Sequence, residues 1–137
     1  MTPAGPTSAA AGEPRVFEAL RRLAREGPVE VRVRGDCMSP LLADGQQVRV
    51  VAARAYWPGD VVVFRAADGR LLAHRLLGYR PRAGGFSLVT RGDACAVHDA
   101  PVPAAAVLGR IAAVRPTFAV RARSLLRFAG LAWRRRR

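Results

Sequence analysis

The segment Gly35-Asp36-Cys37-Met38-Ser39-Pro40 contains the residue best suited to covalent chemistry, a cysteine set among turn-forming residues. A thiolate is a good nucleophile at neutral pH, and a neighbouring imidazolium favours its formation. The chain contains no lysine, because all 23 of its basic residues are arginine. A base that activates Cys37 would therefore be a histidine, and the sequence offers only His74 and His98.

Three segments resemble, in the same order along the chain, the motifs of the signal-peptidase and LexA-repressor clan of peptidases. The segment from Gly35 through Pro40 to Gly45 is similar to the nucleophile box, where the family has serine in place of Cys37. Ala73-His74-Arg75-Leu76-Leu77-Gly78 resembles the box of the endoplasmic-reticulum and archaeal signal peptidases, in which histidine replaces lysine. Thr90-Arg91-Gly92-Asp93-Ala94-Cys95-Ala96-Val97-His98-Asp99 resembles their Lys-Gly-Asp-Asn-Asn box. The resemblance covers about residues 29–114.

This resemblance implies catalytic roles for four residues. Cys37 would be the nucleophile, His74 the general base, and Asp99 the acid that orients the histidine ring. Asp93 would be a second supporting acid. Non-catalytic interpretations stay open. Cys37 could belong to an inactive homologue that only binds peptides, and His74 could be a structural residue packed on the sheet. Asp93 and Asp99 could accept hydrogen bonds from the backbone of their own loop.

The residues around the nucleophile are expected to border a bound substrate: Gly35, Asp36, Met38 and Pro40. Gly35 permits close approach of a peptide backbone, and Pro40 stiffens the turn that presents the sulfur. The charge of Asp36 would oppose thiolate formation. The chain also departs from the family in its third box, because Cys95 and His98 stand where the family has asparagine and aspartate.

No cofactor or metal is expected from the sequence. Cys37, His74, Cys95 and His98 are the candidate zinc ligands, but no pair of them has the close spacing of a Cys-x-x-Cys knuckle. A disulfide between Cys37 and Cys95 that switches activity off is a further hypothesis.

Hydrophobic periodicity predicts a mainly β domain with a helix on each side of it in the sequence. Apolar runs and alternation indicate strands at Val29–Val33, Gln47–Ala52, Val61–Arg65, Arg70–Leu77, Phe86–Thr90 and Val107–Val114. Asp68-Gly69 predicts a tight hairpin that places His74 on the returning strand. Arg80–Gly85 is expected to be a loop, and Arg91–Pro103 to be irregular.

The predicted helices are a short one at Pro14–Arg25 and a basic amphipathic one at Phe118–Trp133. The chain accordingly divides into a disordered leader (1–13), a signal-peptidase-like domain (14–116) and the C-terminal helix (117–137). The resemblance implies that the domain consists of curled antiparallel sheets of the signal-peptidase/LexA type.

The charge distribution favours anionic partners. The net charge is +13, and +7 of it lies in residues 117–137, which contain no acid. This segment has an apolar stripe, Phe118, Ala122, Leu125, Leu126, Ala129 and Trp133. It would either lie on an anionic membrane or pack on the β domain or a partner. No nucleic-acid motif is present, so nucleic acid is not an expected partner. No apolar run is long enough to span a bilayer. We therefore expect a cytoplasmic protein, and peripheral contact with a membrane stays open.

The expected function is that of a cysteine peptidase that cleaves a leader or precursor peptide through a thioester. A non-catalytic peptide-binding homologue is the main alternative. A transpeptidase or cyclase would use the same thioester, with an amine in place of water.

Overall fold

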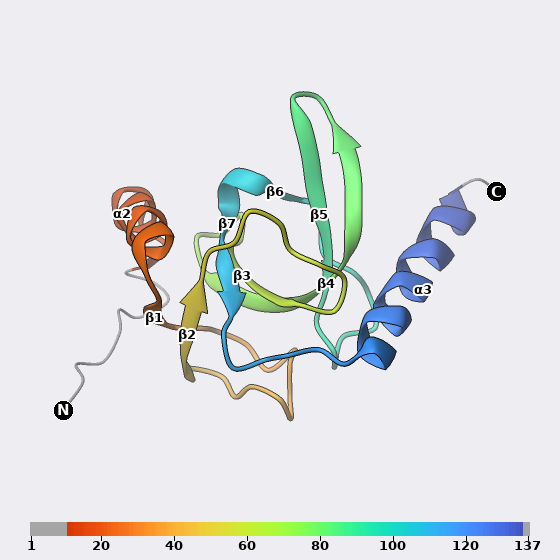
Figure 1. The fold of residues 1–137 in the computed structure, drawn as a ribbon, viewed down its shortest axis with the longest axis horizontal. Helices are drawn as coiled ribbons and strands as arrows, with labels where there is room; N and C mark the ends of the chain where they lie inside the picture. Colours follow the sequence, from red (N-terminus) through yellow and green to blue (C-terminus); the bar gives the residue numbers. More distant parts are fainter. Residues whose placement is uncertain (1–10, 136–137) are drawn as a thin grey trace.

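In the computed structural model, which describes residues 11–135, seven strands form one curled antiparallel sheet (Figure 1). The strands are β1 (Val29–Arg32), β2 (Gln47–Val51), β3 (Val61–Arg65), β4 (Leu71–Arg82), β5 (Gly85–Arg91), β6 (Val102–Pro103) and β7 (Val107–Ile111). Their order is β1-β2-β7-β3-β4-β5-β6. The other elements are α2 (Pro14–Glu26), α3 (Phe118–Arg135) and the short 3-10 turn η1 (Ala104–Ala106). The predicted mainly β architecture with two flanking helices is confirmed, and residues 1–10 of the predicted leader lie outside the described residues.

The hairpin predicted at Asp68-Gly69 is confirmed. Gly69 has φ of +86°, which favours glycine, and the Ala66 N–H donates to the Arg70 carbonyl at 2.8 Å across the turn. The turn sets the register of β3 against β4, in which Val62 is opposite His74. The Asp68-Gly69 turn therefore fixes the position of His74, the candidate base, within the sheet.

The loop predicted at Arg80–Gly85 is wrong, because β4 continues to Arg82 and β5 begins at Gly85. The two strands pair as a long arm that projects from the sheet (Figure 1). β3 pairs with β4 only from Leu71 to Arg75, so the arm has no third strand on that side. Pro81 is tolerated there because its missing N–H faces an open edge. The predicted irregular segment also contains β6, and the last predicted strand ends earlier, at Ile111.

Helix α2 covers one part of the sheet with a narrower apolar face than its sequence suggests. Phe17, Leu20 and Ala24 are buried and join the core formed with β1, β2 and β7. Val16 and Leu23 are 37% and 52% exposed, at the margins of this face. The helix therefore packs on the sheet through about one residue per turn, at positions i, i+3 and i+7, which are Phe17, Leu20 and Ala24.

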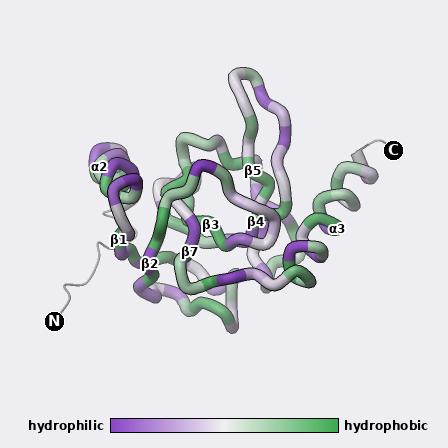
Figure 2. Tube along the Cα trace, in the orientation of Figure 1, coloured by the Kyte–Doolittle hydropathy of each residue, from purple (hydrophilic) through white to green (hydrophobic). Residues whose placement is uncertain are grey.

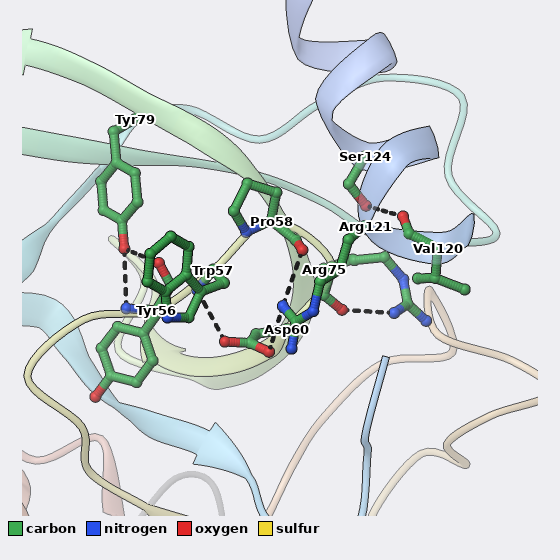
Figure 3. Close-up of polar contacts among 10 residues, drawn as sticks. Tyr56, Trp57, Pro58, Asp60, Arg75, Tyr79, Val120, Arg121 and Ser124 are labelled. Carbon is green, nitrogen blue, oxygen red and sulfur yellow. Dashed lines mark hydrogen bonds and ion pairs between the residues drawn. The ribbon is translucent and has the colours of Figure 1, made fainter. Parts of the chain in front are cut away.

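Helix α3 packs on β4 through a face that is not its most apolar one. Arg121 donates to the Pro58 carbonyl and pairs with Asp60, both at 3.1 Å (Figure 3). Ser124 is 2% exposed. The Phe128 ring lies over Gly78, where a methyl group would be only 2.6 Å from the ring. The absence of a side chain at residue 78 thus allows the helix to lie close to the strand.

The predicted apolar stripe of α3 consequently faces away from the sheet. Phe118, Leu126, Trp133 and Leu125 are 87%, 73%, 63% and 51% exposed. Figure 2 shows hydrophobic residues along much of α3. The sequence-based interpretation that this stripe packs on the β domain is therefore wrong. Within residues 11–135, no helix is both long and apolar enough to cross a membrane.

Candidate functional site

A histidine, an aspartate and a threonine form a connected group where β4 meets the end of β5. His74 is 5% exposed, and its Nδ1 lies 2.5 Å from an Asp99 carboxylate oxygen. The Thr90 hydroxyl donates to that same oxygen at 2.7 Å, and the Asp99 backbone N–H donates to the Thr90 carbonyl at 2.8 Å. Three hydrogen bonds therefore fix Asp99 against His74. Sequence reasoning singled out His74 and Asp99 but missed Thr90.

This arrangement determines which nitrogen of the histidine is available for chemistry. A carboxylate at Nδ1 holds the proton there and leaves Nε2 as the basic nitrogen. Within the described residues Nε2 makes no hydrogen bond. The edge of the Phe64 ring packs against the imidazole, with ring centroids 5.8 Å apart and planes at 76°, which helps to fix its orientation.

Cys37 lies in a turn that follows β1. Gly35 has φ of +91°, and its N–H donates to the Asp44 side chain at 2.8 Å. The Cys37 carbonyl accepts a hydrogen bond from the Ala94 N–H at 2.7 Å. These two hydrogen bonds connect the turn to Asp44, further along the same loop, and to Ala94 in the loop after β5.

Gly92 connects the cysteine turn to the histidine strand. A methyl group on Gly92 would lie 2.5 Å from the Cys37 Cβ, so only glycine permits this contact. Arg75 and Arg91 are paired in the β4–β5 register, and continuing that register by one residue puts Gly92 opposite His74. Opposed residues in antiparallel strands have Cα atoms about 5 Å apart. Cys37 and His74 therefore both lie next to Gly92, although no hydrogen bond joins their side chains within the described residues.

The second cysteine lies beside the first. Its hydrogen bond to Cys37, followed by burial and the nearby negative charges of Cys37, Asp99 and Asp36, raises the pKa of Cys95 to about 11. Cys95 is therefore a protonated thiol at neutral pH. The Cys95 thiol can donate a hydrogen bond to the sulfur of Cys37.

Alkylation of Cys95 by iodoacetamide is expected to become half-maximal near pH 11. The Cys37→Ala variant should lower that pH, because it removes the largest cause of the raised pKa. Since the folded state holds the Cys95 proton more tightly than the unfolded chain, this thiol also makes stability fall as pH rises from about 9 towards 11. Peptide mapping after timed labelling measures both sites separately. Cys95 labelling that follows an ordinary thiol profile would contradict the described contact.

Asp93 is engaged by Arg75 and, among residues 11–135, makes no hydrogen bond to the side chain of His74 or Cys37. Its two carboxylate oxygens accept from Nε and a terminal nitrogen of Arg75, both at 2.7 Å. The other terminal nitrogen of Arg75 donates to the Gly59 carbonyl at 2.7 Å. Asp93 thus joins the loop after β5 to β4 and to the turn after β2, a positioning contact rather than a second acid at His74.

The other predicted site residues occupy different environments. Met38 is 2% exposed, and its sulfur accepts a hydrogen bond from the Asp93 N–H at 3.2 Å. This buried side chain therefore connects the turn to the loop after β5. Gly35, Asp36 and Pro40 are exposed on the outer side of the turn. His98 lines a separate cavity together with arginines. The described residues contain no group of three or more histidine, cysteine or acidic side chains arranged to hold a metal.

An apolar groove adjoins Asp99. It has a volume of about 430 Å³. Its walls come from β3, β4 and the segment after Asp99, and they include Phe64, Leu72, Ala100 and Val102. The groove begins beside the carboxylate that holds the histidine, so a peptide side chain seated in it would lie near the candidate base. Sequence reasoning did not find it, because its walls are far apart along the chain.

No protein-family model and no curated protein matches this sequence.

Proposed function

We propose that this protein is a cysteine peptidase of the signal-peptidase/LexA type that cleaves a leader or precursor peptide. The observation that supports the proposal most is the contact of His74 Nδ1 with Asp99 at 2.5 Å, on the segment that also packs against Cys37. A cysteine, a histidine with one free nitrogen, and an acid that fixes the ring are the parts of a nucleophilic triad.

In the first half of the reaction, His74 Nε2 takes the proton of the Cys37 thiol, and the sulfur attacks the carbonyl carbon of the peptide. The Cys37 backbone N–H donates no hydrogen bond within the described residues, so it can stabilise the negative oxygen of the tetrahedral intermediate. The C–N bond then breaks, and His74 gives its proton to the leaving amine. The product is a thioester on Cys37.

In the second half, a water molecule loses a proton to His74 and attacks the thioester carbon. The C–S bond breaks, the acid product leaves, and the sulfur regains its proton. The Asp99 carboxylate stabilises the imidazolium that forms twice. An amine that replaces water would form a new amide bond, which is the transpeptidase or cyclase alternative.

The sheet provides a place for an extended substrate beside this centre. β4 pairs with β3 from Leu71 to Arg75 but with β5 only from Arg75 onward. Within residues 11–135, no strand therefore pairs with Leu72 and Ala73 on the β5 side, while the Leu71 carbonyl accepts a hydrogen bond from the Arg34 N–H at 3.0 Å. A peptide could add as a strand at this edge. Its side chains would then alternate between solvent and the apolar groove beside Asp99.

An electrophilic peptide tests the proposal without knowledge of the natural substrate. The probe is acetyl-Ala-Ala-Ala vinyl sulfone, and the readout is intact mass with peptide mapping. We expect one adduct on Cys37, formed at least tenfold more slowly in His74→Ala, because proton transfer by a positioned base gives on the order of 10²–10⁴ in rate. The Cys95→Ser variant should still react. Equal labelling of both cysteines, or a rate indifferent to His74, would favour the binding-module alternative.

We further propose that the exposed stripe of α3 makes peripheral contact with an anionic membrane. Four large apolar side chains of this one helix are more than half exposed. An exposed apolar surface beside basic residues is typical of a helix that lies on a membrane. Sedimentation with phosphatidylglycerol vesicles measures the contact, and Leu126→Ser with Trp133→Ser should abolish it. A wild-type protein that stays in the supernatant would contradict it.

A further inference from the structure

A second cavity, of about 520 Å³, lies between α3 and the sheet. Four arginines and His98 line it together with apolar residues: Arg80, Arg91, Arg127, Arg134, Leu77 and Leu131. No acidic residue is among the lining residues. The cavity therefore gathers positive charge around a partly apolar space, which no element of the proposed catalytic reaction uses.

Three of these arginines have no partner of their own. Within residues 11–135, the side chains of Arg80, Arg127 and Arg134 make no hydrogen bond or ion pair. Only Arg91 is engaged, because its Nε donates to the Cys95 carbonyl at 2.6 Å. Guanidinium groups that face one cavity repel one another, and an anion between them removes that repulsion. Their planar forks match the two oxygens of a carboxylate.

The cavity shares a loop with the catalytic centre. Ala96, Val97 and His98 line the cavity, and they connect Cys95, which touches Cys37, to Asp99, which holds His74. An extended peptide advances about 3.3 Å per residue. A substrate that lies across Cys37 would therefore reach this cavity with a residue only a few positions from the scissile bond.

The geometry of α3 argues against a membrane headgroup as the occupant. Successive residues of a helix are separated by about 100° around its axis, which puts Arg127 and Arg134 roughly 130–150° from the centre of the exposed apolar stripe. A membrane against Phe118 and Leu126 would lie on the other side of the helix from the cavity. Charge and shape thus favour a small acidic group delivered from the catalytic side.

We propose that this cavity binds the carboxylate of an aspartate or glutamate in the peptide substrate and so makes the enzyme selective for acidic leader or precursor peptides. This inference rests on the proposed function, in which the substrate is a leader or precursor peptide. Apolar lining residues would pack the stem of the acidic side chain while the arginines bind its oxygens.

The test measures binding rather than cleavage and uses the 137-residue chain with the Cys37→Ala substitution. The probes are fluorescein-labelled decapeptides of alanine and serine in which one glutamate is moved through every position, each paired with a glutamine version. Fluorescence anisotropy should show one or two positions at which glutamate binds about tenfold more tightly than glutamine. Arg127→Gln with Arg134→Gln should remove that preference. Arg123→Gln, on the same helix but outside the cavity, should retain it.

Several results would overturn the inference. These are equal binding of glutamate and glutamine peptides, no binding by any peptide, or a preference that survives loss of Arg127 and Arg134. Binding of inorganic phosphate or of short-chain phosphatidylglycerol that depends on these arginines, without a glutamate preference, would reassign the cavity to those ligands. The proposed function is judged separately by Cys37 labelling: labelling without glutamate preference overturns this inference alone, and glutamate preference without labelling leaves an acidic-peptide binding module.

Discussion

Asp99→Asn is expected to slow the reaction of Cys37 with the vinyl sulfone probe by a factor on the order of 10²–10⁴. The Asp99 carboxylate accepts a hydrogen bond from Nδ1 of His74 at 2.5 Å and thereby leaves Nε2 unprotonated. An amide can present its NH₂ group to Nδ1 instead, which places the proton on Nε2. A histidine in that tautomer cannot take the proton of Cys37.

Two control variants make the Asp99→Asn result specific. Thr90→Val removes one hydrogen bond to the Asp99 carboxylate and keeps its charge, so it should cost about tenfold or less. Asp68→Asn makes the same chemical change in an exposed hairpin and should leave the rate unchanged. Inactivation rates measured over a range of probe concentrations separate reaction from binding. An Asp99→Asn rate within a factor of two of wild type would contradict the role of Asp99.

Gly109→Ala is expected to lower the free energy of unfolding by about 3 kcal/mol. Gly109 lies in β7, between β2 and β3 in the sheet. A methyl group there would be 2.5 Å from the Val51 carbonyl oxygen and 2.7 Å from a Val50 methyl, and backbone cannot move aside as a flexible side chain can. The strain would either displace β2 or separate it from β7.

Gly27→Ala is the matched control, because Gly27 has extended backbone with φ of 178° and no neighbouring atom within 4 Å of an added methyl. It should change stability by less than about 0.5 kcal/mol. Urea denaturation followed by circular dichroism measures both variants. If Gly109→Ala also fell within about 0.5 kcal/mol of wild type, the close contact of β7 with β2 would be wrong.

The parts of the fold that sequence alone could predict are those set by neighbouring residues. The Asp68-Gly69 turn and the apolar run of β3 specify their hairpin without reference to the rest of the chain. The sequence predicts the end of β4 too early, because Gly78, Pro81 and the nearby glycines are usual signals of a loop. Pairing of β4 with β5, a contact between two separate segments, overrides them there.

The orientation of α3 could not be read from its own sequence. Its hydrophobic pattern points to the stripe of Phe118 and Leu126, yet the helix packs through Arg121 and Phe128. The deciding features lie elsewhere in the chain: a buried carboxylate at Asp60 attracts Arg121, and Gly78 leaves room for the Phe128 ring. Such choices depend on tertiary contacts that periodicity does not contain.

The candidate site shows the same division. His74 and Asp99 were singled out by residue type and by a family resemblance, and the structure brings them into contact. Thr90 and the proximity of the Cys95 and Cys37 thiols emerge only when the strand end and the two loops come together. Asp93 has the residue type of a catalytic acid, but Arg75 engages both of its oxygens.

The most direct measurement of the central claim is the rate of iodoacetamide labelling of Cys37 at neutral pH, in wild type and in His74→Ala. Peptide mapping reports Cys37 and Cys95 separately in the same sample. We predict that wild-type Cys37 reacts much faster than Cys95, that His74→Ala slows Cys37 at least tenfold, and that the two proteins converge above about pH 9, where a free thiol ionises without help. A Cys37 rate that is the same in both proteins at every pH would contradict an activated Cys37–His74 pair.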